Sequence, residues 1–121
     1  MTSEPSAQPI PPYFLQEAAD LLQQLDEGLQ KLRQNFDIHQ VHGLMRVAHT
    51  LKGAAASVGR DAIKTTTHAL EDVFRALCTP EAQMTAEVER LIFEAYDCLK
   101  LLLEAGTDRG KQDCNSMKLM C

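Results

Sequence analysis

The chain has 121 residues, a hydrophobic fraction of 45% and a formal net charge of −5. This length allows one hydrophobic core rather than two, and the composition is that of a folded protein. The acidic balance argues against nucleic acid as a partner, because binding to phosphate backbones requires clustered lysine and arginine. The sequence shows neither an apolar run that could span a membrane nor a signal-peptide pattern, so we expect a cytoplasmic protein without a membrane partner.

Residues 1–12 are rich in proline, serine and glutamine, which predicts a disordered lead. From Tyr13 onwards, apolar residues recur every three or four positions, as on one face of a helix of about six turns. Gly28 interrupts this pattern at a cost of about 1 kcal/mol relative to alanine, which is too little to end the helix. The predicted inward residues of this helix are Leu15, Ala18, Leu22, Leu25, Leu29, Leu32 and Phe36.

A second helix is predicted to begin at Asp37, a favourable N-cap, and to end at Gly59, a typical C-terminal glycine. A third helix is predicted to begin at Asp61, whose carboxylate suits a helix N-terminus. The predicted inward residues are Ile38, Val41, Met45, Ala48, Leu51, Ala55 and Val58 in the second helix, and Ile63, Thr67, Leu70, Phe74 and Leu77 in the third.

A fourth helix is predicted over residues 85–104, after a loop at 79–84. Its predicted inward residues are Val88, Leu91, Ala95, Leu99 and Leu102. Residues 105–121 show no period and are interpreted as a loose tail or an appended remnant. Four amphipathic helices joined by short loops predict an all-α fold, an antiparallel up-and-down four-helix bundle over residues 13–104.

The outer face of the second helix carries the residues that indicate chemistry. Because Ala48 and Leu51 are predicted to point inward, His49, Lys52 and Gly53 lie beside the core and are expected to face solvent. A single histidine in such a place is most simply a solvated surface residue. Its relation to the third helix argues for a role.

The turn at Arg60 places polar residues of the two helices at the same height. His49 lies eleven residues before Arg60 and Glu71 eleven after it, while Lys52 and His68 are each eight residues away. Antiparallel helices that rise about 1.5 Å per residue from one turn keep such pairs level. We therefore expect His49, Lys52, His68 and Glu71 to form one exposed polar cluster.

Such a cluster suits a histidine that acts as a nucleophile. A carboxylate that accepts the Nδ1–H proton leaves the Nε2 lone pair pointing outward, as in the serine protease triad. We expect Glu71 to orient His49 in this way and Lys52 to offset the charge of a phosphoryl group. Neutral imidazole is the nucleophile, so acceptance of the group is expected to fade at acid pH.

The same face is expected to bind a partner. Gly53 leaves room for a close approach, and Arg46, Gly53 and Ala56 are the predicted partner-binding residues. The sequence contains no glycine-rich phosphate loop and no carboxylate set for Mg²⁺ with ATP. We therefore expect no bound cofactor and no metal ion in this domain, with ATP and Mg²⁺ supplied by partner domains.

The segment from Ala48 to Gly53 resembles the H-x-x-K-G signature of histidine phosphotransfer (Hpt) domains. It is most similar to the amino-terminal domain of the chemotaxis histidine kinase CheA. Residues 67–72 and 14–32 also resemble that group's second signature and first helix. The resemblance implies a chemotaxis-type two-component phosphorelay, in which an ATP-bound kinase domain is the donor and an aspartate of a response-regulator receiver domain is the acceptor.

For the site, the resemblance implies that His49 is phosphorylated, that Glu71 is its hydrogen-bond partner, and that Lys52 and His68 are polar neighbours. It leaves open whether the domain stands alone or belongs to a longer kinase, and hence whether the chain is itself part of an enzyme. Three other interpretations remain: a helical adaptor that docks a signalling partner without chemistry, a metal-binding bundle using His42, His49 and His68, and a bundle of this fold that has lost phosphotransfer.

Overall fold

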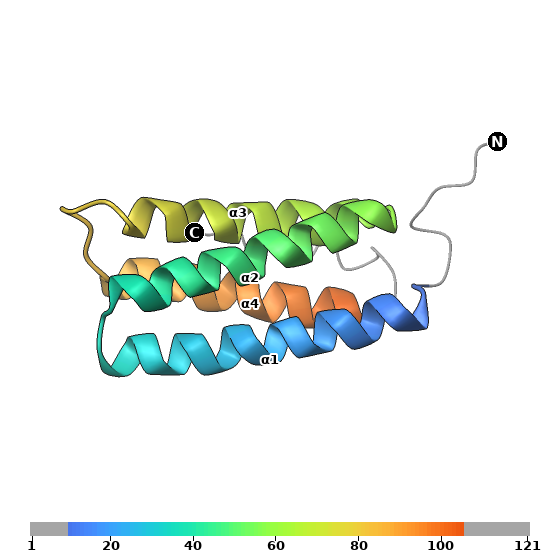
Figure 1. Ribbon diagram of the computed structural model, residues 1–121, viewed down its shortest axis with the longest axis horizontal. Helices are drawn as coiled ribbons and strands as arrows, with labels where there is room; N and C mark the ends of the chain where they lie inside the picture. Colours follow the sequence, from blue (N-terminus) through green and yellow to red (C-terminus); the bar gives the residue numbers. More distant parts are fainter. Residues whose placement is uncertain (1–9, 106–121) are drawn as a thin grey trace.

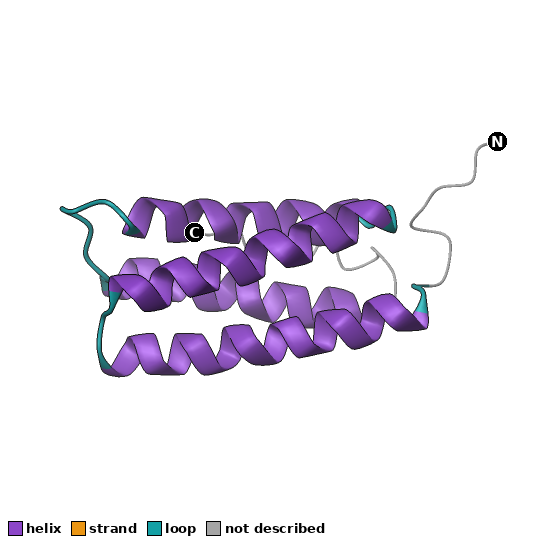
Figure 2. Cartoon of the chain, in the orientation of Figure 1, coloured by secondary structure: helices purple, strands orange, loops and turns teal. Residues whose placement is uncertain are grey.

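The computed structural model describes residues 10–105 of the chain, and this part contains four helices and no strand (Figure 2). The helices are α1 (Pro12–Gln34), α2 (Ile38–Ser57), α3 (Asp61–Leu77) and α4 (Ala86–Ala105). They lie side by side and alternate in direction, so the α2–α3 turn lies at one end and the other two connections lie at the opposite end (Figure 1). The predicted all-α four-helix bundle is confirmed.

Local signals in the sequence fix where α2 begins and where α4 begins. The side chain of Asp37 accepts a hydrogen bond from the backbone N–H of His39 at 3.0 Å and caps the first turn of α2, as predicted. The hydroxyl of Thr85 accepts from the backbone N–H of Val88 at 3.1 Å and caps the first turn of α4. Each cap satisfies an amide group that the helix itself leaves unpaired.

The turn between α2 and α3 is a glycine-terminated helix end. Gly59 has a positive φ of 72°, a conformation that costs other residues about 1–2 kcal/mol. Its N–H donates to the carbonyl of Ala56, and the N–H of Arg60 donates to the carbonyl of Ala55 at 2.9 Å. This pair of bonds is the Schellman pattern, and it reverses the chain within a few residues.

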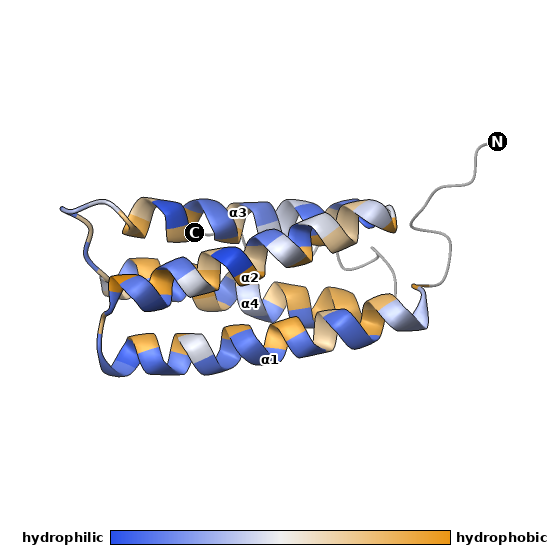
Figure 3. Cartoon of the chain, viewed as in Figure 1, coloured by the Kyte–Doolittle hydropathy of each residue, from blue (hydrophilic) through white to orange (hydrophobic). Residues whose placement is uncertain are grey.

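The core lies between the four helices, whose apolar sides face one another while charged residues cover the outside (Figure 3). Most of the predicted inward residues are buried, including all five of α3. Two predictions for α1 were wrong: Leu15 and Phe36 are exposed, and Phe14 and Leu21 are buried instead. In α2, Leu44 is buried, whereas the predicted inward residue Met45 is only partly covered. Residues on either side of the predicted line of apolar positions can therefore face the core.

Gly28 marks a close approach of α1 and α2. A Cβ atom at this position would lie 2.5 Å from Cδ2 of Leu44 and 2.9 Å from Nε2 of Gln40. The glycine is therefore more than a tolerated weak helix former, because its missing side chain makes room for the buried Leu44.

The predicted lead at 1–12 and tail at 105–121 lie mostly outside the described residues. Within the described part, Ile10 is buried against the core, and α1 begins at Pro12, one residue before the predicted start. Proline suits the first turn of a helix, where its missing N–H has no intrahelical partner.

Candidate functional site

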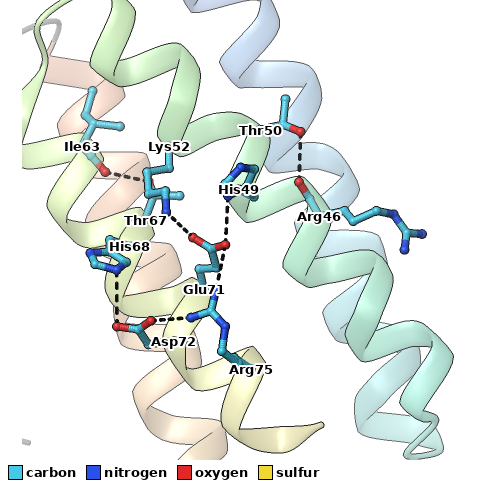
Figure 4. A network of polar contacts seen from close by, with 10 residues as sticks. All are labelled: Arg46, His49, Thr50, Lys52, Ile63, Thr67, His68, Glu71, Asp72 and Arg75. Atoms are coloured by element: carbon cyan, nitrogen blue, oxygen red, sulfur yellow. Dashed lines mark hydrogen bonds and ion pairs between the residues drawn. The ribbon is translucent and has the colours of Figure 1, made fainter.

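His49 projects from the middle of α2. Its neighbours Ala48 and Leu51 are fully buried, so the helix turns the imidazole outward, and the side chain is 68% exposed. Its Nδ1 atom lies 3.0 Å from Oε2 of Glu71 on α3 (Figure 4). The Nε2 atom has no hydrogen-bond partner among the described residues. The ring is thus held on one side and open on the other.

Glu71 is the residue whose environment differs most from the sequence-based expectation. It was predicted to be exposed, but its side chain is only 4% exposed. The reason is its position beside Leu70 and Phe74, both of which face the core, at the place where α2 packs closely against α3. A buried carboxylate requires compensating partners, and the structure provides them from both helices.

Lys52 supplies the partner for the second carboxylate oxygen. Its Nζ atom lies 2.7 Å from Oε1 of Glu71, and its side chain is 25% exposed. The prediction that Lys52 offsets the charge of a phosphoryl group stays a prediction. In the structure Lys52 forms an ion pair with Glu71, so its direct effect is to hold and stabilise the carboxylate that orients His49.

The charge state of Glu71 determines the tautomer of His49. Burial raises the pKa of the Glu71 carboxyl, but contacts with Lys52 and His49 lower it by more, so the pKa lies below its ordinary value of 4.5. At neutral pH the carboxylate is ionised and accepts hydrogen bonds only. The proton between the two groups therefore belongs to Nδ1 of His49, and the Nε2 lone pair of the neutral ring points to solvent.

His68 joins the network through Asp72. Its Nε2 atom is 3.6 Å from Oδ2 of Asp72, and no direct contact with His49 or Lys52 occurs within the described residues. The network continues through Arg75, which contacts Asp72 at 2.8 Å and Glu71 at 3.2 Å (Figure 4). The sequence analysis missed Asp72 and Arg75, although their spacings from His68 and Glu71 are both four residues, the spacing of side chains that meet on a helix.

The sequence matches the family model of the Hpt domain over residues 13–107. The chain belongs to this family. The resemblance first drawn from the two short motifs is confirmed by a match that covers all four helices.

Relatives of this Hpt domain include chemotaxis proteins and a sensor histidine kinase. CheA of Bacillus subtilis is 34% identical over 98 residues, which cover 80% of this chain and 15% of the relative. CheA of Klebsiella aerogenes is 30% identical over 109 residues, covering 89% and 17%. The sensor histidine kinase CheAY of Helicobacter pylori is 31% identical over 103 residues, covering 84% and 13%. The chain thus spans less than a fifth of these relatives, and no solved structure matches it significantly.

The three residues predicted to bind a partner share the open side of α2 in this Hpt domain. Gly53 and Ala56 follow His49 by four and seven positions, and both are exposed. A Cβ atom built on Gly53 would meet nothing within 4 Å. Arg46 is exposed and lines a shallow hollow beside the imidazole together with Met45, His49, Thr50, Glu71 and Arg75.

The structure also bears on metal binding and membrane insertion. Among residues 10–105, no group of three or more histidine, cysteine, aspartate and glutamate side chains is arranged to hold a metal ion. None of the helices in that range has both the length and the apolar character needed to cross a bilayer.

Proposed function

We propose that this Hpt domain is a phosphoryl carrier of a chemotaxis-type phosphorelay, in which His49 receives a phosphoryl group from an ATP-bound histidine kinase domain and delivers it to an aspartate of a response-regulator receiver domain. The carrier acts in the cytoplasm, without a cofactor of its own, and its partners supply ATP and Mg²⁺. The observation that carries the proposal is the imidazole of His49, with Nδ1–H held by a buried carboxylate and Nε2 open to solvent.

In the first step, the Nε2 lone pair attacks the γ-phosphorus of ATP. The N–P bond forms as the P–O bond to ADP breaks, and ADP leaves with the bonding pair. The Nδ1 proton stays on the ring, which becomes positively charged. Oε2 of the ionised Glu71 lies 3.0 Å from Nδ1, so Glu71 accepts that proton in a hydrogen bond and stabilises the charge that develops on the ring.

In the second step, a carboxylate oxygen of the receiver attacks the same phosphorus. The P–N bond breaks, its electron pair returns to Nε2, and neutral imidazole is restored. Both steps require in-line access to an exposed atom. The 68% exposure of His49 and the open space at Gly53 provide this access.

The roles assigned to the residues follow from these steps. His49 is the nucleophile, Glu71 orients its ring, and Lys52 holds Glu71. His68 lies at the outer end of the network, separated from Glu71 by two residues, Asp72 and Arg75. Arg46, Gly53 and Ala56 would contact the partner rather than the reacting atoms.

The direct test is incubation with a CheA-type kinase core and labelled ATP. The parent should acquire acid-labile, alkali-stable label, as phosphohistidine does, and His49→Gln should acquire none. His39→Gln and His42→Gln are matched controls, because both histidines are also exposed on α2 and should leave labelling unchanged. Label that persists in His49→Gln would place the reacting residue elsewhere, and an unlabelled parent would favour a helical adaptor.

A further inference from the structure

The carboxylate of Glu71 is restrained through both of its oxygens. Oε1 lies 2.7 Å from Nζ of Lys52. Oε2 accepts hydrogen bonds from two residues, Nδ1–H of His49 at 3.0 Å and Nη2–H of Arg75 at 3.2 Å. The oxygen that orients the nucleophile therefore has a second donor, and that donor comes from the helix that carries the carboxylate.

Arg75 is itself fixed by a second carboxylate. While Nη2 donates to Glu71, Nη1 donates to Oδ1 of Asp72 at 2.8 Å. The planar guanidinium presents N–H groups of two different nitrogens to two acceptors, a fixed geometry that the compact ammonium of lysine does not match. Asp72 in turn faces His68 at 3.6 Å. The positions of Glu71, Asp72 and Arg75 along one helix make this arrangement intrinsic to α3.

We propose that Arg75 is a positioning residue, whose guanidinium bridges Asp72 and Glu71 and holds Oε2 where it accepts the Nδ1–H proton of His49. Without Arg75, Oε2 retains only His49 as its partner, and Lys52 at Oε1 is the remaining ion pair that restrains the carboxylate. Arg75 does not touch the reacting nitrogen. Its effect on phosphoryl transfer rests on the proposed function, whereas its effect on the ring of His49 does not.

The tautomer of His49 provides a readout that a merely structural role would not change. Nitrogen chemical shifts of a neutral imidazole distinguish the Nδ1–H tautomer from the Nε2–H tautomer. The shifts are measured at about pH 8.5, where imidazoles are neutral. In Arg75→Ala, the ratio of Nδ1–H to Nε2–H should fall about two- to fivefold, the range expected for the loss of one exposed charged pair. Arg75→Lys should restore only part of the loss, because lysine keeps the charge but not the bridge.

Arg90→Ala is the matched control. Arg90 also pairs with a glutamate four residues further along its helix, Glu94, at 3.4 Å, and it is similarly exposed, but it lies on α4. This variant should leave the tautomer ratio of His49 unchanged. A tautomer ratio in Arg75→Ala equal to that of the parent would overturn the proposal. Full restoration of the ratio by Arg75→Lys would show that the guanidinium bridge between Asp72 and Glu71 is not required.

A phosphorylation assay on the same variants separates this proposal from the function itself. If the parent accepts the phosphoryl group, Arg75→Ala should lower kcat about two- to fivefold and leave the KM of the kinase for the Hpt domain unchanged. A parent that fails to accept phosphate, combined with a changed tautomer ratio in Arg75→Ala, would refute the carrier function and leave the positioning role of Arg75 intact.

Discussion

Replacement of Glu71 by glutamine removes the charge that orients His49 and keeps the shape of the side chain. Because Glu71 is buried, alanine would also leave a cavity beside Leu70 and Phe74 and confuse stability with chemistry. Glutamine avoids this. The cations it leaves behind, Lys52 and Arg75, both reach solvent, so we expect the bundle to remain folded with a loss of about 1 kcal/mol.

The magnitude of the effect on phosphorylation follows from the lost bond. A hydrogen bond to a charged group contributes about 1.5–3 kcal/mol, which corresponds to roughly 10- to 100-fold in rate. The amide of glutamine can still accept from Nδ1–H, but it can also present its NH₂ group and favour the wrong tautomer of His49. Replacement of aspartate by asparagine in the serine protease triad, where this occurs, sets an upper limit of about 10⁴-fold.

The assay is rapid-quench phosphorylation by a kinase core with saturating labelled ATP, over a range of concentrations of the Hpt domain. We expect kcat of Glu71→Gln to fall about 10- to 100-fold, with KM nearly unchanged, because the charge is needed most when the ring becomes positive. Glu87→Gln is the control, since Glu87 is exposed in the first turn of α4. Circular dichroism should show the same helix content in all three proteins. A folded Glu71→Gln protein with a kcat within about twofold of the parent would refute the reasoning.

Two further predictions concern stability. Because the pKa of Glu71 is lowered in the folded state, the stability that Glu71 contributes is present above about pH 4.5 and is lost as the pH falls through the folded-state pKa. The free energy of unfolding, measured in urea, should therefore fall more on acidification for the parent than for Glu71→Gln. Parallel pH profiles of the two proteins would contradict this. Gly28→Ala should destabilise the bundle by about 1 kcal/mol, because crowding against Leu44 outweighs the gain in helix propensity. Gly53→Ala should stabilise it by about 0.5–1 kcal/mol, because the added Cβ meets nothing. Thermal unfolding of both variants measures the two changes, and equal shifts in Tm would refute the contrast.

The fold could be predicted from the sequence because its signals are local. The spacing of apolar residues, the cap at Asp37 and the glycine at position 59 all act within one or two helical turns. The errors in α1 have a different origin. Phe14 and Leu15 are both apolar and adjacent, and only the contacts with the other helices decide which of them is buried.

The site was predictable to the extent that helix geometry determines it. Counting outward from the turn indicated that His49 and Glu71 lie at the same height, and they are 3.0 Å apart. The burial of Glu71 could not be predicted in this way, because a charged residue gives no sign in the sequence that its neighbours will cover it. The ion pair of Lys52 with Glu71 likewise depends on side-chain conformations that residue spacing leaves open.

The Schellman turn at Gly59 also sets the register of α3 relative to α2, and so the position of Glu71 relative to His49. One residue inserted there and taken up into the first turn of α3 would rotate the following residues by about 100° and shift them by about 1.5 Å relative to α2, which would carry Glu71 away from the imidazole. The connection between α3 and α4 joins the helices at the opposite end of the bundle. Length changes during evolution should therefore be tolerated at that distant loop and forbidden at the short hairpin.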